Sequence, residues 1–428
     1  MEWIILLVSL FVLVFSGMWL AVALGITTFI ALYFLADGAH IIIGSAIWDS
    51  IQIYGLVAVA LFILMGQIVL QSGVGKRVYS SLLPLFDRVP GGLLHTNVAS
   101  CAVFAATFGS SAATAAVVGS AALPELRSRK YDQSLSLGSI AAGGTLGIMI
   151  PPSGAFIIYG SLTETSVGGL LAAGILPGIM LALMFSSYIG VKCRLNPHLA
   201  PATAPVPLGT AIRKAFGLWP LLALIAFVLT PIFAGWTTAT EAASWGVFGA
   251  LILGKFYGKL EVAHLKDALK ETAYVFTMLN FIVAGARILG VAAGLIGLPR
   301  QLVLYVTGLS VPGIAIIIGL VLMYLALGCL FDGISFMVMT LPFVFPIVQA
   351  LGYDPIWFGV MMVLMIEAGQ LTPPVGVNLY IVQAIAGKET TLGAVIRGVW
   401  PFFLLQVVAA AIVIAFPIVA LAIPSILY

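Results

Sequence analysis

Long apolar stretches recur along this chain, and short polar connectors separate them. A helix needs about 20 apolar residues to cross a hydrocarbon core of about 30 Å, and many of these stretches approach or exceed that length. The apolar runs lack the strict alternation of a membrane β-strand. The pattern therefore predicts an all-α polytopic membrane protein. Representative stretches are residues 4–35, 53–69, 218–233, 314–330 and 402–423.

Two of the apolar runs carry Pro-Pro-x-Gly in the middle: IPPSGAFIIYG at 150–160 and TPPVGVNLYIV at 372–382. Proline lacks an amide N–H and clashes with the preceding turn, so each motif should divide a span into two half-helices. Unpaired backbone groups are costly in lipid unless something else satisfies them. Sodium, a hard cation, takes such oxygen atoms as ligands. We expect ion sites at these breaks, with a simple proline kink as the alternative.

The chain also repeats itself at a shift of about 222 residues. A Tyr-Asp pair stands at 131–132 and again at 353–354, and each Pro-Pro follows the tyrosine at the same distance. The glycines of the two motifs, Gly154 and Gly376, are separated by the same shift. Several landmarks at a near-constant offset predict two structural repeats, which we place at 1–205 and 206–428.

Basic residues set the expected orientation of the two repeats. RSRK precedes the first Tyr-Asp pair, whereas QALG, which has no cation, precedes the second. Because Lys and Arg concentrate in cytoplasmic loops, equivalent points of the repeats should lie on opposite sides of the membrane. Inverted-topology repeats with paired interrupted segments are typical of secondary transporters, and the interruptions point to the binding site.

A stretch of small and polar residues precedes each Tyr-Asp pair and predicts a re-entrant hairpin. We expect hairpins at about 90–127 and 311–350, and broken helices at about 132–160 and 356–386. A carboxylate in an apolar run is costly and usually functional, which favours a ligand role for Asp332. Small residues also permit close helix packing, which is the alternative for the first tip. The hairpin tips offer oxygen ligands at Ser110, Ser111, Thr114, Asp332, Gly333 and Ser335.

Composition narrows the class of function. Of 428 residues, 62% are hydrophobic and 8% are charged, against about 25% charged in soluble domains. The three cysteines have neither metal nor disulfide spacing. GxxxxGK[ST], HExxH and GxSxG are all absent, so the sequence does not support an ATPase, a zinc hydrolase or a serine hydrolase. The first apolar run lacks the basic n-region of a signal peptide, so we interpret it as a membrane span that the mature protein keeps.

Four further charges stand in or beside apolar runs. Glu241 is expected to cap a helix start together with Thr238 or Thr240, with a substrate role as the alternative. Glu367, on the second broken span, fits either a transport pathway or a structural pair. Arg287 fits an anionic substrate, a salt bridge or snorkelling to the interface. Arg300 fits the docking of a partner at the outer surface.

Four stretches carry a family resemblance: GSSAATAAVVGSAALPEL, GGTLGIMIPPSGAFIIYG, TTATEAASWGVFGALILG and EAGQLTPPVGVNLYIV. Over essentially its whole length the chain resembles the large membrane subunit of tripartite ATP-independent periplasmic (TRAP) transporters. The resemblance implies an elevator-type fold, with a scaffold and a mobile transport domain, in the bacterial inner membrane. It implies sodium as the coupling ion and no other cofactor. It also implies two partners, a separate four-helix small membrane subunit and a periplasmic substrate-binding protein, and a small organic anion such as sialic acid or a C4-dicarboxylate as substrate.

The resemblance also implies positions for the ions and the substrate. The first sodium site would lie at Ser110, Ser111, Gly147, Pro152 and Gly154. The second would lie at Gly328, Asp332, Gly333, Gln370, Thr372 and Gly376. The substrate would lie between them, near Thr114, Ser335 and Asn378.

The leading function is therefore sodium-coupled, binding-protein-dependent import of a small organic anion. A stand-alone sodium:carboxylate symporter of similar architecture is the alternative. An intramembrane enzyme would need a nucleophile–base pair or a metal cluster, and neither is visible in the sequence. A channel would not need two inverted repeats with broken helices.

Overall fold

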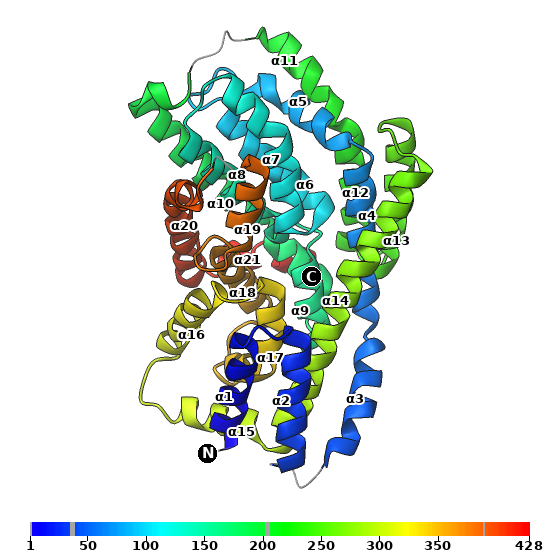
Figure 1. The fold of residues 1–428 in the computed structure, drawn as a ribbon, viewed down its shortest axis with the longest axis vertical. Coiled ribbons are helices and arrows are strands. Elements are labelled where there is room, and N and C mark those ends of the chain that lie inside the picture. The colour runs from blue at the N-terminus through cyan, green and yellow to red at the C-terminus, as the bar shows by residue number, and fades with distance from the viewer. Residues whose placement is uncertain (1, 35–38, 202–205, 388–389) are drawn as a thin grey trace.

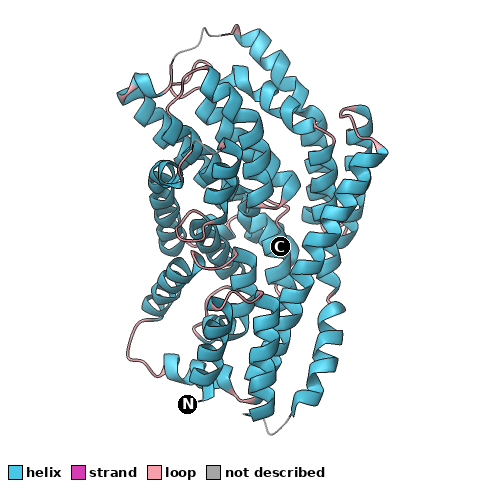
Figure 2. Ribbon diagram, in the orientation of Figure 1, coloured by secondary structure: helices cyan, strands magenta, loops and turns pink. Residues whose placement is uncertain are grey.

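The computed structural model describes residues 2–34, 39–201, 206–387 and 390–428, and every regular element in these ranges is helical (Figure 2). The long axis runs from the N-terminus and α15 (Leu298–Thr307) at one end to α5 (Val74–Phe86) and α11 (Leu208–Ala215) at the other (Figure 1). Both α5 and α11 carry adjacent basic residues. The end with α5 and α11 is therefore cytoplasmic by the positive-inside rule.

The apolar run at 4–35 forms two helices rather than one tilted span. α1 (Glu2–Phe15) and α2 (Leu20–Phe34) are joined by a turn in which Gly17 has a φ of 83°. That left-handed conformation favours glycine because it lacks a Cβ. Leu35, the last residue of the run, lies outside the described residues. The chain continues through η1 (Ala39–Ile41), α3 (Ile42–Ile51) and α4 (Tyr54–Gln71) to α5.

Each half of the chain contains one helical hairpin followed by one broken helix. The first hairpin is α6 (Leu93–Phe108) and α7 (Ser111–Ser128), and the second is α16 (Gly313–Gly328) and α17 (Gly333–Ala350). The first lies in the upper half of Figure 1 and the second in the lower half, so the two hairpins enter from opposite ends. The broken helices are α8 (Gln133–Met149) with α9 (Gly154–Thr163), and α18 (Pro355–Gln370) with α19 (Val377–Ala386).

The remaining helices connect and surround these elements. The predicted division at 205/206 falls beside residues 202–205, which lie outside the described ranges, and it stays a prediction. The connecting helices are α10 (Val167–Leu195), η2 (Pro197–Leu199), η3 (Phe216–Leu218), α12 (Trp219–Phe233), α13 (Ala239–Phe256), α14 (Val262–Leu295), α20 (Leu392–Ala415), α21 (Ile418–Leu421) and α22 (Pro424–Leu427).

The two Tyr-Asp landmarks are the start signals of the broken helices. The Asp132 carboxylate accepts a hydrogen bond from the Leu135 amide at 2.8 Å. The Asp354 carboxylate accepts hydrogen bonds from the amides of Ile356 and Trp357, at 2.7 and 3.1 Å. An aspartate at this position satisfies amides that the first turn of a helix leaves unpaired. The landmark recurs because both repeats begin a buried helix in the same way.

The two broken helices form the centre of the molecule. Residues 135–149 of α8 and 357–370 of α18 are all buried. α8 packs against α6, α7 and α20, and α18 packs against α16, α17 and α20. Protein encloses the first break, where Pro151, Pro152 and Ser153 are buried, whereas Pro374 and Val375 of the second break are exposed. Irregular backbone is tolerated at membrane depth where it is buried in protein or lines a water-filled space.

Seven helical segments of the described chain are long and apolar enough to cross a membrane. Large apolar side chains such as Trp19, Phe216 and Phe256 are exposed, as expected where lipid rather than water surrounds the protein. The seven segments are Tyr54–Gln71, Gln133–Thr163, Val167–Leu195, Leu208–Phe233, Val262–Leu295, Gly333–Ala350 and Leu392–Ala415.

A capping box begins α13 and confirms the interpretation of Glu241 as a capping residue. The Glu241 carboxylate accepts a hydrogen bond from the Thr238 amide at 2.7 Å, and the Thr238 hydroxyl accepts one from the Glu241 amide at 3.3 Å.

Loss of an N-cap costs about 0.5–2 kcal/mol. We expect Thr238→Ala to lower the thermal midpoint of the purified protein by about 1–4 °C with transport unchanged, as measured by scanning fluorimetry and uptake. Thr238→Ser should restore the midpoint, and a variant that loses uptake at an unchanged midpoint would contradict this role.

Candidate functional site

The tip of the first hairpin touches the break of the first broken helix. Gly109 has a φ of 57°, and Ser110 is the N-cap of α7. A Cβ added to Gly109 would lie 2.9 Å from the Pro152 carbonyl oxygen. A Cβ added to Gly147 would lie 2.6 Å from the Ser110 carbonyl oxygen and 2.7 Å from the Thr114 hydroxyl oxygen. Only glycine at these two positions allows so close an approach.

Backbone oxygen atoms at this contact are left without donors. Within the described chain no hydrogen bond reaches the carbonyl oxygen of Gly109 or of Pro152. The Ser111 hydroxyl lies beside α8 and donates to the carbonyl oxygen of Thr145 in that helix at 3.4 Å. Free carbonyl oxygens next to hydroxyls form a donor set that a hard cation can use. The structure thus brings together all five residues expected at the first sodium site.

A direct backbone hydrogen bond joins the second hairpin to the second break. The Val375 amide donates to the Cys329 carbonyl oxygen at 3.0 Å. A Cβ added to Gly369 would lie 2.6 Å from the Gly328 carbonyl oxygen, so α16 and α18 meet backbone to backbone. The second repeat therefore reproduces the tip-and-break contact of the first.

The loop after α18 gathers further oxygen atoms. A Cβ added to Gly376 would lie 2.9 Å from the carbonyl oxygens of both Gln370 and Thr372. A Cβ added to Gly333 at the tip would lie 3.3 Å from the side-chain amide nitrogen (Nε2) of Gln370. The Thr372 hydroxyl donates to the Ala368 carbonyl oxygen at 2.7 Å, which leaves its oxygen able to accept or to bind a cation.

Asp332 stands at the second tip as the N-cap of α17. Its carboxylate accepts hydrogen bonds from the Ser335 amide at 3.2 Å and from the Ser335 hydroxyl at 2.9 Å. Both bonds use Oδ2, so Oδ1 has no hydrogen bond among the described residues. The side chain is exposed rather than enclosed by apolar residues. Helix capping thus uses one oxygen of the Asp332 carboxylate. The other oxygen, Oδ1, is free to bind a cation.

The three residues expected at the substrate site do not form one hydrogen-bonded cluster. The hydroxyls of Thr114 and Ser335 are each bonded within their own hairpin tip. The Asn378 side chain donates to the Ala141 carbonyl oxygen at 3.1 Å and so joins the second broken helix to the first. Among the residues in the described ranges, no hydrogen bond joins any two of the three. Their shared role stays a prediction.

Two buried polar pairs that we did not predict from the sequence hold α8 to its neighbours. The Gln406 amide donates to the Thr145 hydroxyl at 2.7 Å, between α20 and α8. The Asn97 amide donates to the Ser139 hydroxyl at 2.9 Å, between α6 and α8. A signal for the first pair was present, because Gln406 interrupts the apolar run at 402–423.

The structural pair considered for Glu367 is wrong. The residue is fully buried in α18, and neither carboxyl oxygen has a hydrogen bond of good geometry within the described chain. The backbone of Met149, at the end of α8, is the polar group beside the Glu367 carboxyl group. Unpartnered oxygen atoms on Asn378 and Gln406 accompany it in the core. Other buried polar atoms of the described chain that make no hydrogen bond lie both in this core, as in Thr96 and Ser100, and outside it, as in Thr27 and Thr237.

The salt bridge considered for Arg287 is also wrong. The ion pairs in the described residues both involve Arg129, with Asp87 and Glu125, near the cytoplasmic end of the first hairpin. Arg287 is exposed on α14 and has no carboxylate within ion-pairing distance. No group of three or more His, Cys, Asp or Glu side chains that could hold a metal ion occurs in the described part of the chain.

The family description "Tripartite ATP-independent periplasmic transporter, DctM component" matches residues 7–419. The chain belongs to the DctM family of TRAP transporters. It is a large permease of the bacterial inner membrane that crosses the membrane several times, and it is a transport protein rather than an enzyme. The family match confirms the resemblance found in the four sequence stretches.

Curated relatives of this DctM-family chain span nearly all of it. The C4-dicarboxylate TRAP transporter large permease protein DctM of Pseudomonas aeruginosa is 34% identical over 385 residues, which cover 89% of this chain and 88% of that protein. The sialic acid TRAP transporter large permease protein SiaM of Vibrio cholerae is 30% identical over 381 residues, which cover 88% and 87%.

The YdaH transporter of Alcanivorax borkumensis, a crystal structure described as having an unusual topology, resembles this DctM-family chain in fold. The TM-score is 0.63 at 16% sequence identity, over 89% of each chain. At that identity the likeness concerns the fold alone. It agrees with the all-α membrane architecture expected from the sequence.

Proposed function

We propose that this chain is the large permease of a sodium-coupled TRAP transporter that imports a small organic anion by an elevator motion. One observation carries the proposal: each repeat places a hairpin tip against a broken helix, with oxygen atoms that accept no hydrogen bond within the described chain. These are the carbonyl oxygens of Gly109 and Pro152 in the first repeat and Oδ1 of Asp332 in the second. Paired interrupted segments of this kind hold coupling ions and substrate in secondary transporters. Two such contacts offer two sodium sites.

The first sodium ion would be held at the first tip-and-break contact. The free carbonyl oxygens of Gly109 and Pro152 support that assignment, together with the hydroxyls of Ser110 and Ser111. The second ion would be held at the second contact, where Oδ1 of Asp332 accepts no hydrogen bond within the described chain and the neighbouring tip residue Gly333 lies beside Gln370. The substrate would bind between the two tips, at Thr114, Ser335 and Asn378.

An elevator motion needs one body that moves and one that stays. The hairpins and broken helices share a continuous core, in which α8 packs against α6, α7 and α20 and α18 packs against α16 and α17. The long helix α14 packs mainly against α2, α3 and α4, and it also contacts α17 of the first group. We assign the first group to the transport body and the second to the scaffold.

The substrate class and the partners rest on the family. Relatives are named for C4-dicarboxylates and for sialic acid, which are both organic acids. A soluble periplasmic binding protein would deliver the acid, and a separate small membrane subunit would complete the scaffold. A stand-alone sodium:carboxylate symporter is the second candidate, because the ion sites and the hairpins lie wholly within this chain.

The test is uptake of labelled carboxylates into proteoliposomes under an inward sodium gradient. We expect uptake only when the chain is combined with a small membrane subunit and a cognate binding protein, because a tripartite system takes its substrate from the binding protein. Replacing the sodium gradient with a potassium gradient should abolish uptake.

Two outcomes separate the candidates. Uptake by the chain alone would establish the stand-alone symporter and overturn the tripartite assignment. Uptake that is indifferent to sodium would overturn both ion sites, whatever the partners.

A further inference from the structure

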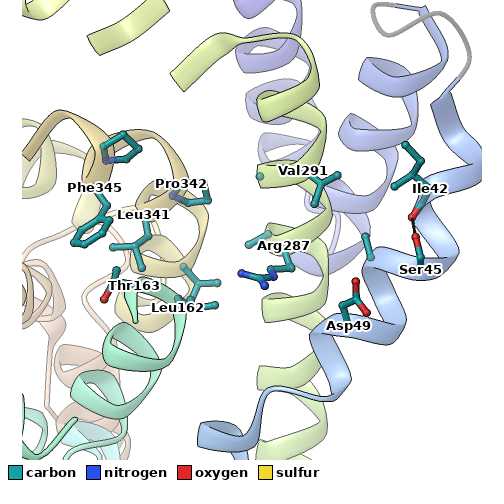
Figure 3. A pocket seen from close by; sticks show the side chains of 15 residues that line it. Ile42, Ser45, Asp49, Leu162, Thr163, Arg287, Val291, Leu341, Pro342 and Phe345 are labelled. Atoms are coloured by element: carbon teal, nitrogen blue, oxygen red, sulfur yellow. Dashed lines mark hydrogen bonds between the residues drawn. The ribbon is translucent and has the colours of Figure 1, made fainter. Parts of the chain in front are cut away.

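A cavity of about 480 Å³ lies between the proposed scaffold and the proposed transport body. Helices α3 and α14 form one wall, and α9 and α17 form the other (Figure 3). Most of the lining is apolar, with Pro342 of α17 as an example. The polar side chains are few: Arg287, Asp49, Ser45 and Thr163.

Arg287 is the only cation in the lining of this cavity. Figure 3 shows its side chain extending from α14 toward α9 and α17. Within the described chain the guanidinium has neither a hydrogen bond nor an ion pair. A charge on a membrane-spanning helix is costly unless it faces a partner or a water-filled space. Among the described residues this guanidinium has no partner, so it faces the open cavity and is available to a ligand.

The two hydroxyl groups that line the cavity are not hydrogen-bonding partners of the Arg287 guanidinium. Ser45 donates to the Ile42 carbonyl oxygen at 2.9 Å, and Thr163 donates to the Tyr159 carbonyl oxygen at 2.8 Å. Asp49 on α3 lies in the same lining but beyond ion-pairing distance. The cavity therefore presents one unpaired cation and one unpaired anion at separate points.

The cavity also adjoins the proposed substrate site. Val338 lines it and lies three residues beyond Ser335, which is about one turn of α17, so the two side chains share a face of that helix. A ligand in the cavity would thus lie beside the second hairpin tip. It would also contact both bodies whose relative movement carries substrate across the membrane.

We infer that Arg287 binds the carboxylate of the transported acid in this cavity, and that the acid carries one carboxylate and at least one hydroxyl or ammonium donor. This inference rests on the proposed function and narrows its substrate class. A planar guanidinium binds a carboxylate with two parallel hydrogen bonds. Asp49 accepts a hydrogen bond from a hydroxyl or ammonium group, whereas a second carboxylate on the ligand would face a like charge.

The first experiment needs no knowledge of the natural substrate. The full chain carrying S45C is reconstituted and treated with an anionic (sulfonatoethyl) or a cationic (trimethylammonioethyl) methanethiosulfonate reagent, and the chain without S45C gives the background from its own thiols. Asp49 lies one turn from position 45 on α3, so Arg287 and Asp49 act on the charged reagents in opposite senses. R287Q should lower the ratio of the anionic to the cationic reaction rate about tenfold, and D49N should raise it. R300Q, a charge removal on α15 outside the lining, should leave the ratio unchanged.

The second experiment tests the ligand class by protection of S45C from the anionic reagent. Gluconate has one carboxylate and several hydroxyls, and succinate has two carboxylates and no hydroxyl. We expect gluconate to protect at a concentration at least about tenfold lower than succinate. D49N should reduce that difference to about twofold, and R287Q should abolish protection by both.

Three outcomes would overturn the inference. The first is a thiol that neither reagent reaches, the second is a ratio of anionic to cationic reaction rates that R287Q does not change, and the third is succinate protecting as well as gluconate. A thiol that reacts in the chain alone but is shielded by a co-reconstituted small membrane subunit would assign the cavity to that subunit instead. These readouts need no transport, so failure of sodium-driven uptake in the wild type would be seen separately.

Discussion

Asp332→Asn is expected to raise the sodium requirement of uptake severely while leaving the folded protein intact. Asparagine caps a helix about as well as aspartate, so the hydrogen bonds to Ser335 survive and only the charge is lost. A unit charge 4 Å from an ion contributes about 4 kcal/mol at an effective dielectric constant of 20. The sodium concentration for half-maximal uptake should therefore rise about a hundredfold or more, as measured in proteoliposomes with the partner subunits present.

Asp354 offers a matched control for this experiment. It is also an exposed aspartate that caps a helix of the second repeat, but it begins α18 and does not lie at a hairpin tip. Asp354→Asn should leave the sodium dependence within about twofold of the wild type, because capping is preserved there too. If Asp332→Asn transports normally while Asp332→Ala merely lowers the yield of folded protein, Asp332 is a capping residue alone.

Gly398→Ala is expected to prevent accumulation of folded protein. Helices α8 and α20 cross backbone to backbone at this point, and a Cβ added to Gly398 would lie 1.9 Å from the Ser134 carbonyl oxygen. A Cβ added to Gly138 would lie 2.1 Å from the Gly398 carbonyl oxygen. Backbone atoms of two packed helices cannot move aside as a flexible side chain does. The expected cost is about 3 kcal/mol or more, at the upper end of overpacking effects.

The measurement is the monodisperse yield of the detergent-solubilised protein by fluorescence-detected size-exclusion chromatography. We expect Gly398→Ala and Gly138→Ala to reduce that yield at least about tenfold. Gly393→Ala is the matched control, because it lies on the same helix and its Cβ would meet no atom within 4 Å. There the higher helix propensity of alanine should leave the yield equal or raised. Wild-type yield from Gly398→Ala would show that the two helices do not cross this closely.

Much of the fold follows from local chemistry that a sequence carries openly. Pro-Pro removes amide donors and glycine relaxes the backbone, so the breaks after α8 and α18 fall where the two motifs stand. The Tyr-Asp pairs mark the starts of the same helices because aspartate caps the first turn. The threonine and glutamate at the start of α13 form the capping box for the same local reason.

Part of the candidate site could also be anticipated. Each tip and each break is a short segment of distinctive composition, and the internal repeat shows that the two belong together. The tip-and-break contacts at Gly147 and at Gly369 agree with that expectation. The substrate residues were a weaker expectation, because Thr114, Ser335 and Asn378 belong to three separate helices. No local pattern fixes the distances among them.

The sequence by itself determined the helical class, the two breaks, the caps and the basic end of the molecule. These features depend on residues within a few positions of one another or on simple charge counts. Only the tertiary structure decided which distant residues meet. Examples are the crossing of Gly138 with Gly398, the buried Glu367 whose carboxyl oxygens make no hydrogen bond of good geometry in the described chain, and Arg287, which faces a cavity and has no ion pair among the described residues. The physical reason is that such contacts depend on how helices far apart in the chain pack, and packing is a property of the whole set of side chains rather than of any one stretch.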